Sequence, residues 1–147
     1  MKNLINQISY DGWANSRYFD VLSMFDQRTL DQTITSSFPS IHETLVHILW
    51  AEELWFERWQ GRSFVKSLNL ADYPTASLIR TKLEDVHQKQ LTLLRGMDPA
   101  SADLAVSYVN FRDQRWEYSL RQMVQHLVFH SAYHRGQLAT MLRQLGK

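Results

Sequence analysis

Four long segments of the chain repeat their apolar residues every three or four positions, the spacing of an amphipathic helix. They cover about residues 2–24, 40–61, 75–95 and 119–145. One long connection, about residues 62–74, separates the second segment from the third. Helices of this length bury their apolar faces against one another. The pattern therefore predicts an all-α four-helix bundle with a long crossover connection.

The ends of these segments carry helix start and stop signals. Ser40 and Glu43 have the S-x-x-E spacing of a capping box, and Phe38 is placed to act as a hydrophobic staple. Gly61 is a suitable stop for the same helix. These signals predict that the second helix begins at about residue 40.

The stretch 104–118 does not follow the helical pattern. It is rich in β-branched and aromatic residues, which predicts a short β-hairpin or extended crossover with its turn near Arg112–Gln114. We find no internal repeat or low-complexity segment. The 147 residues are enough to bury a core, so we expect a single domain spanning residues 1–147.

The composition excludes several function classes. Sixteen basic and fifteen acidic residues give a net charge of +1, so no nucleic-acid partner is expected. The chain has no cysteine, which rules out disulfides, thiolate ligands and a cysteine nucleophile. No signal peptide and no apolar run of roughly 20 residues is present, so we expect a cytoplasmic protein with no membrane partner.

Three histidines lie one helical turn apart in the last segment: His126, His130 and His134. Residues four apart share a helix face, so the rings of His130 and His134 can converge on one ion. Two ligands seldom hold an ion firmly, and bundles usually supply the third from a facing helix. The spacing predicts a metal site with a further ligand from another segment.

Two histidines of the second segment compete for that place. His42 and His47 are five residues apart, about 140° around a helix, so both cannot face the same ion. His47 lies in the middle of an apolar helix and is favoured. We expect His42, in the first turn, and His87, among charged neighbours, to be solvated.

A structural alternative applies to each of these residues. A histidine pair at this spacing is more often a surface pair or a hydrogen-bonded core pair than a metal site. Tyr133 could donate a proton, but we expect it to be a buried, hydrogen-bonded tyrosine. Most tryptophan and tyrosine residues are also expected in the core: Trp13, Trp50, Trp55, Trp59, Trp116 and Tyr133.

The C-terminal run HLVFHSAYHRGQLATMLRQLG resembles the signature helix of the DinB/YfiT-like family of metal-binding four-helix bundles. Two other segments agree in order and spacing, YDGWANSRYFDVL and SFPSIHETLVHILWAEELWFERW. The resemblance implies that His47, His130 and His134 hold one divalent ion, and that His126 is not a ligand. Phe129 stands where the family often has asparagine, which puts a polar role at that position in doubt.

Three neutral imidazoles would leave the ion its full charge and an open position for water or substrate. Glu43, His126, Asn15 and Gln137 are candidates for contacts to the ligands or the substrate. Zinc or nickel is the expected cofactor, and iron, copper and manganese are alternatives, because histidine ligation suits several metals.

The resemblance implies reaction classes as well. Members of the wider family include enzymes that use a small thiol and others proposed as hydrolases. We expect a metal-dependent enzyme that activates a thiol cosubstrate or water for attack on a small electrophile, in stress response or detoxification. The alternative is a non-enzymatic, metal-stabilised stress-response module. The resemblance also implies a homodimer.

Overall fold

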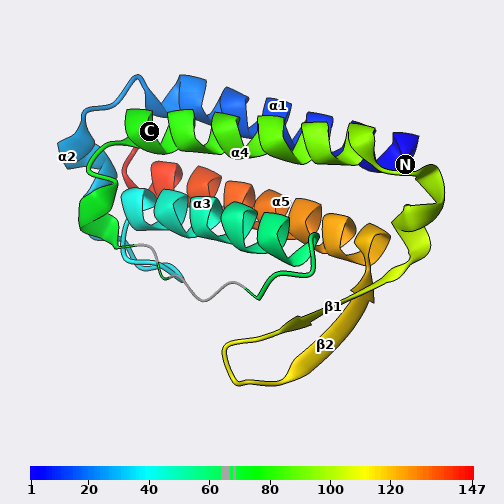
Figure 1. Ribbon diagram of the computed structural model, residues 1–147. Helices are drawn as coiled ribbons and strands as arrows, with labels where there is room; N and C mark the ends of the chain where they lie inside the picture. Colours follow the sequence, from blue (N-terminus) through cyan, green and yellow to red (C-terminus); the bar gives the residue numbers. More distant parts are fainter. Residues whose placement is uncertain (64–66, 68) are drawn as a thin grey trace.

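The computed structural model describes residues 1–63, 67 and 69–147. Four long helices lie side by side in two layers (Figure 1). Helix α1 packs on α4 and α5, and α3 packs on the same two helices. The four helices are α1 Lys2–Leu22, α3 Ile41–Arg58, α4 Ala76–Gly96 and α5 Leu120–Gln144. The prediction of a four-helix bundle is confirmed.

The order of helix directions explains the long connection. Helices α1 and α5 run one way along the bundle, and α3 and α4 run the other way (Figure 1). Because α3 and α4 run in the same direction, the chain must return the length of the bundle between them. The short elements are α2 Gln27–Leu30 and the 3₁₀ turns η1 Leu70–Asp72 and η2 Pro99–Asp103.

A two-stranded hairpin projects beside the bundle at the start of α5 (Figure 1). Strands β1 Ala105–Val109 and β2 Arg115–Ser119 are antiparallel, with Tyr108 opposite Trp116. Asp113, in the connecting turn, has a φ of 56°. The predicted hairpin and its turn are both confirmed.

Side-chain caps start the helices at the expected places. Ser40 Oγ accepts the N–H of Glu43 at 3.1 Å, as predicted for α3. A reciprocal capping box occurs at the start of α5, where the side chains of Ser119 and Gln122 each accept the other residue's backbone N–H.

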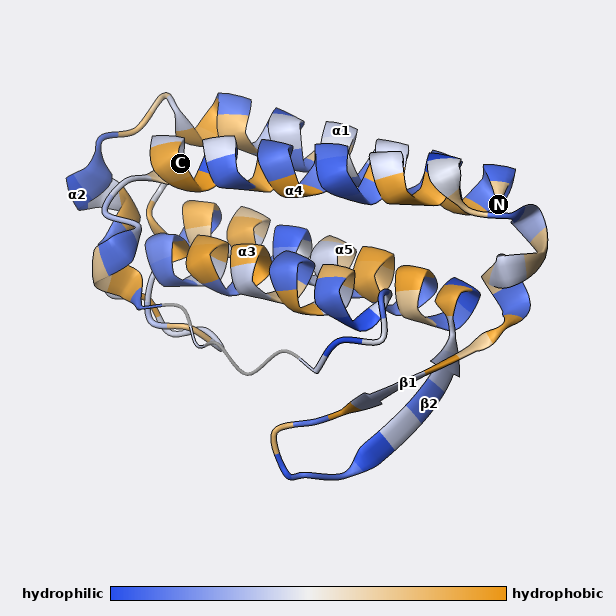
Figure 2. Cartoon of the chain, in the orientation of Figure 1, coloured by the Kyte–Doolittle hydropathy of each residue, from blue (hydrophilic) through white to orange (hydrophobic). Residues whose placement is uncertain are grey.

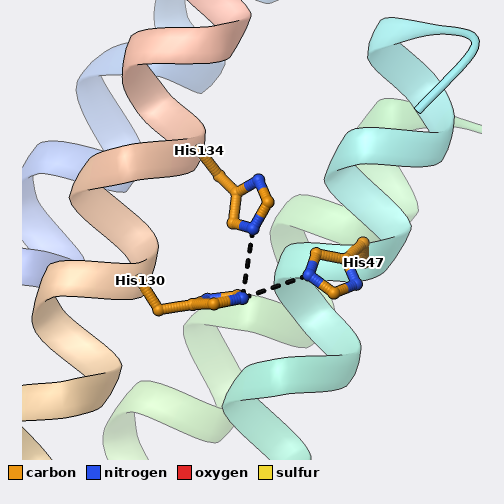
Figure 3. Close-up of side chains that lie close together, drawn as sticks. All are labelled: His47, His130 and His134. Carbon is orange, nitrogen blue, oxygen red and sulfur yellow. Dashed lines mark hydrogen bonds between the residues drawn. The ribbon is translucent and has the colours of Figure 1, made fainter. Parts of the chain in front are cut away.

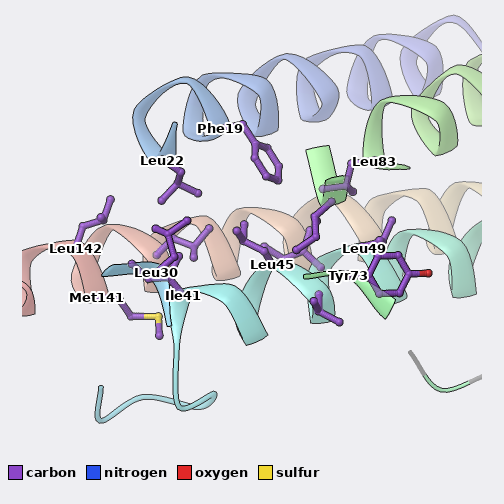
Figure 4. Close-up of a cluster of buried hydrophobic side chains, with 14 of the residues drawn as sticks. Phe19, Leu22, Leu30, Ile41, Leu45, Leu49, Tyr73, Leu83, Met141 and Leu142 are labelled. Carbon is purple, nitrogen blue, oxygen red and sulfur yellow. The ribbon is translucent and has the colours of Figure 1, made fainter. Parts of the chain in front are cut away.

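The apolar faces of the helices meet along the bundle axis (Figure 2). They form two clusters. The first includes Phe19, Leu45 and Met141 (Figure 4), and the second includes Leu4, Trp55 and Leu127. Where the two clusters meet, each long helix carries buried polar residues that contact one another. We call this set the polar layer: Asp11, Asn15, Glu52, His87, Gln90, Ser131 and Arg135.

The predicted core aromatics divide into two groups. Trp55 and Trp59 are buried as expected, and Trp50 is half-buried. The expectation is wrong for Trp13, Trp116 and Tyr133, which are 59%, 42% and 62% exposed. Residue type favours the interior but does not fix which side of a helix or hairpin faces it.

In the part of the chain that the structure describes, no helix combines the length and the apolar character needed to cross a bilayer.

Candidate metal centre

Three imidazole rings from two antiparallel helices point toward one another (Figure 3). His130 and His134 lie on the same face of α5, and His47 faces them from the middle of α3. His130 Nε2 lies 3.1 Å from His47 Nε2 and 3.1 Å from His134 Nε2. Zinc binds imidazole nitrogen at about 2.0–2.1 Å, so two nitrogens on a tetrahedral ion lie about 3.3 Å apart. The observed spacing is close to that of a metal site.

Hydrogen bonding alone does not account for these contacts. His134 Nδ1 donates to Gln137 Oε1 at 2.7 Å, so the neutral ring has a bare Nε2 facing His130. Each neutral ring carries one N–H, and His130 Nε2 can donate to only one of its two neighbours. A cation among the three nitrogens removes the remaining repulsion between lone pairs.

The surroundings keep the rings neutral. Burial and, after it, the neighbouring rings of His134 and His47 together lower the pKa of His130 to about 3. Burial also lowers the pKa of His47 to about 4, with His134 as the second cause. The pKa of His134 is lowered by burial as well. At neutral pH these nitrogens therefore present lone pairs, the form that binds metal.

The predicted supporting residues lie in different places. Gln137 contacts a ligand ring directly, as described above. The His126 ring lies 6.3 Å from the His130 ring and is outside the group of converging nitrogens. Glu43 is half-buried one turn before His47, and among the described residues its carboxylate bonds to no histidine of the triad. Asn15 belongs to the polar layer, where its side chain bonds Asp11 and Ser131.

Two aromatic side chains that we did not predict for this site line it. The Phe38 ring lies 4.4 Å from the His47 ring and 5.9 Å from the His134 ring. Trp50 stacks on His47 at 5.8 Å. Phe38 precedes the cap of α3, which is why the sequence suggested only a staple. Both rings therefore pack against His47, and Phe38 also lies beside His134.

Comparisons with known proteins identify the family. The model of the DinB family matches residues 1–147. The chain belongs to the DinB family. It is similar to Protein DinB of Bacillus subtilis strain 168, with 26% identity over 144 residues that cover 93% of this chain and 83% of that protein.

This DinB-family fold also matches a solved structure. YfiT from Bacillus subtilis is described as a probable metal-dependent hydrolase with an unusual four-helix bundle topology. It superposes with a TM-score of 0.73 and 12% identity, covering 99% of this chain and 87% of that one. At this identity the match supports the shared fold.

A second group of potential ligands lies in the polar layer of this DinB-family chain. Asp11, Glu52 and His87 bring ligand atoms within 4.8 Å of one another. Arg135 already supplies a cation there, because its Nη1 donates to Asp11 Oδ1 at 2.6 Å and to Asn15 Oδ1 at 2.8 Å. We therefore interpret this group as a structural charge network.

The polar layer shifts the pKa values of its ionisable groups, raising those of Glu52 and His87 and lowering that of Asp11. Burial raises the pKa of Glu52 to about 8. Burial opposes protonation of His87, but Glu52 and Asp11 outweigh it and hold the pKa of the imidazole above its ordinary value. Burial also disfavours the ionised form of Asp11, yet the contacts of its carboxylate with His87 and Arg135 keep its pKa below the ordinary value.

The structure corrects three expectations for single residues. His87 is 6% exposed and packed in the polar layer, so the expectation of a solvated residue is wrong. His42 is also 6% exposed, and its ring nitrogens contact Asp31 Oδ1 at 2.8 Å and the Tyr73 carbonyl at 2.6 Å. Tyr133 is exposed, and its hydroxyl accepts from Gln137 Nε2 at 3.0 Å.

Proposed function

We propose that this DinB-family protein is a metal-dependent enzyme whose divalent ion is held by His47, His130 and His134. An ion held there would activate a thiol cosubstrate or water for attack on a small electrophile. The observation that carries this proposal is the convergence of three neutral Nε2 atoms. Within the described residues no fourth histidine or carboxylate joins them, and a three-ligand set leaves a position open for a reactant.

When bound, such an ion lowers the pKa of a coordinated water or thiol toward neutrality and so supplies a nucleophile. The chain's own residues orient the site. Gln137 fixes the His134 ring through Nδ1 and also holds the Tyr133 hydroxyl. That hydroxyl lies at the exposed rim of the site, where it can donate a hydrogen bond to a bound electrophile.

Two observations bear on the nucleophile. The structural neighbour is described as a probable metal-dependent hydrolase, which supports water. The absence of cysteine means that any thiol comes from a second substrate, consistent with the thiol-dependent members that the family resemblance implies. A role in detoxification or stress response and a homodimeric assembly remain predictions.

The ligand set is tested by titrating zinc or nickel into metal-free, untagged protein by calorimetry. We expect one ion per chain. His130→Ala should lower the affinity by more than about 100-fold, because even residues that only support a ligand change affinity about 10- to 100-fold. His126→Ala is the matched control, one turn earlier on the same helix, and should bind nearly as the wild type does. Equal affinities for the two variants would reject the triad.

The reaction is tested with metal-loaded protein, an activated ester, and a panel of small thiols with a chromogenic electrophile. Turnover that requires the metal and is lost in His130→Ala would support an enzyme. Metal binding without turnover on any of these reactants would support the stress-response module.

A further inference from the structure

A second feature lies beside the metal centre, between the hairpin, the end of α3 and the start of α5. It is a pocket of about 600 Å³, within the usual range for small-molecule sites. Its walls are mainly aromatic, and a single buried cation, Arg58, lines it. The residues used below are Trp55, Arg58, Tyr108, Phe111, Trp116 and His126.

Arg58 is 7% exposed and has no carboxylate partner among the described residues. The four positions outside them are Phe, Val, Lys and Leu, so they supply none. The guanidinium carbon lies 4.3 Å from the Tyr108 ring centre and 4.8 Å from the Trp55 ring centre. Cation–π contacts use the faces of a guanidinium, while its N–H donors lie along the edge and still need acceptors.

The donors of Arg58 are not all satisfied. Its Nε is buried and has no hydrogen-bond partner. A buried cation without an anion is costly, and the lowered pKa of Arg58 reflects its burial. A carboxylate offers two acceptor oxygens in the geometry that matches the guanidinium edge. The unpaired donor therefore indicates that a carboxylate would complement Arg58 in this pocket.

Aromatic contacts connect the pocket to the metal centre along two routes. His126 lies 4.6 Å from the Trp55 ring and 6.3 Å from the His130 ring. On the other side, Phe111 stacks on Trp50 at 5.6 Å, and Trp50 stacks on His47 at 5.8 Å. A molecule held at Arg58 thus lies next to the residues that surround the triad.

We propose that this pocket binds a small organic carboxylate with an apolar body, placing the carboxylate on Arg58 and the body against the aromatic walls. The binding itself is independent of the metal. Its role as the substrate pocket of the triad rests on the proposed function.

The test uses metal-free wild-type protein, 2-naphthoate and the neutral isostere 2-naphthamide, followed by NMR of the tryptophan indole N–H groups. Naphthoate should bind about 10- to 100-fold more tightly than the amide, the usual gain from hydrogen bonds to a charged group. The signals of Trp55 and Trp116, which line the pocket, should move, and that of Trp13 should not. Equal affinities for the two ligands, or shifts at Trp13 alone, would overturn the proposal.

A variant separates the charge of Arg58 from its packing. Arg58→Met keeps the aliphatic volume and should remove the preference for naphthoate while leaving amide binding within about threefold. Arg121→Met, which changes an exposed arginine outside the pocket, should keep the preference. An unchanged preference in Arg58→Met would reject the site. Because no metal is present, these outcomes do not depend on the calorimetric test of the triad.

Discussion

Among the described residues, two clusters bring potential metal ligands within 4.8 Å of one another, and they differ in charge. In the triad, burial lowers the pKa values of all three rings, and their Nε2 atoms converge. In the polar layer, the carboxylates of Glu52 and Asp11 raise the pKa of His87, and Arg135 pairs with Asp11. No ion pair of the described residues involves the triad, whereas Arg135 supplies a cationic side chain to the polar layer.

This difference indicates which cluster is suited to a metal ion. Neutral imidazoles bind an ion without first releasing protons. In the polar layer an ion would have to compete with the Arg135 guanidinium for the same carboxylate. We therefore expect metal binding at the triad, and we expect the polar layer, which joins α1, α3, α4 and α5, to fix the positions of these helices.

The largest effect is expected from breaking the charge pairing of the polar layer. Arg135→Met leaves the Asp11 carboxylate buried without its main partner, and removing one member of a buried pair costs about 3–5 kcal/mol. We expect a loss of this size in the free energy of unfolding, measured by urea denaturation. The exposed Arg143→Met is the control and should change it by less than about 0.5 kcal/mol. A loss no larger than that of the control would contradict the assigned role of the layer.

The raised pKa values of Glu52 and His87 in the polar layer should make the stability of the protein depend on pH. The folded chain holds the Glu52 proton up to about pH 8, whereas the unfolded carboxyl loses it near 4.5. His87 likewise keeps its proton above 6.5 only when folded. The folded state therefore binds more protons, and the Glu52 carboxyl makes the free energy of unfolding fall as the pH rises from about 4.5 to about 8.

Glu52→Gln should remove most of this fall. The substituted amide cannot ionise, and its oxygen can still accept from Gln90 Nε2. Urea midpoints at the two pH values measure the effect. Glu117→Gln, in the exposed hairpin, should retain the wild-type slope. An unchanged slope in Glu52→Gln would show that the layer does not titrate as described.

The bundle and the convergence of the triad could be predicted because both depend on helical periodicity. His130 and His134 are one turn apart, and the apolar stripe of α3 gave the phase of His47. The prediction for His42 was wrong because its partners Asp31 and Tyr73 lie in the connections outside its helix, which helical periodicity does not place.

The polar layer was missed for a different reason. The direct neighbours of His87 are charged, which suggested a solvated face. Its neighbours one turn away, Leu83 and Leu91, are both buried, so helical phase held the correct signal. The layer depends on four helices contributing one or two polar groups each, and that pairing is invisible until the helices are packed.

The smallest predicted effect concerns the space around His87. Gly12 lies in α1, and a Cβ built there would be 3.3 Å from Cγ and Nδ1 of the His87 ring. Gly136, in α5, has nothing within 4 Å of the same position. Alanine favours a helix over glycine by about 1 kcal/mol, so Gly136→Ala should raise the free energy of unfolding by up to that amount. Gly12→Ala makes the same exchange against a packed ring, and overpacking costs about 1–3 kcal/mol. We therefore expect it to lower the free energy of unfolding by about 1 kcal/mol in urea denaturation, and an increase matching Gly136→Ala would show that His87 is free to move.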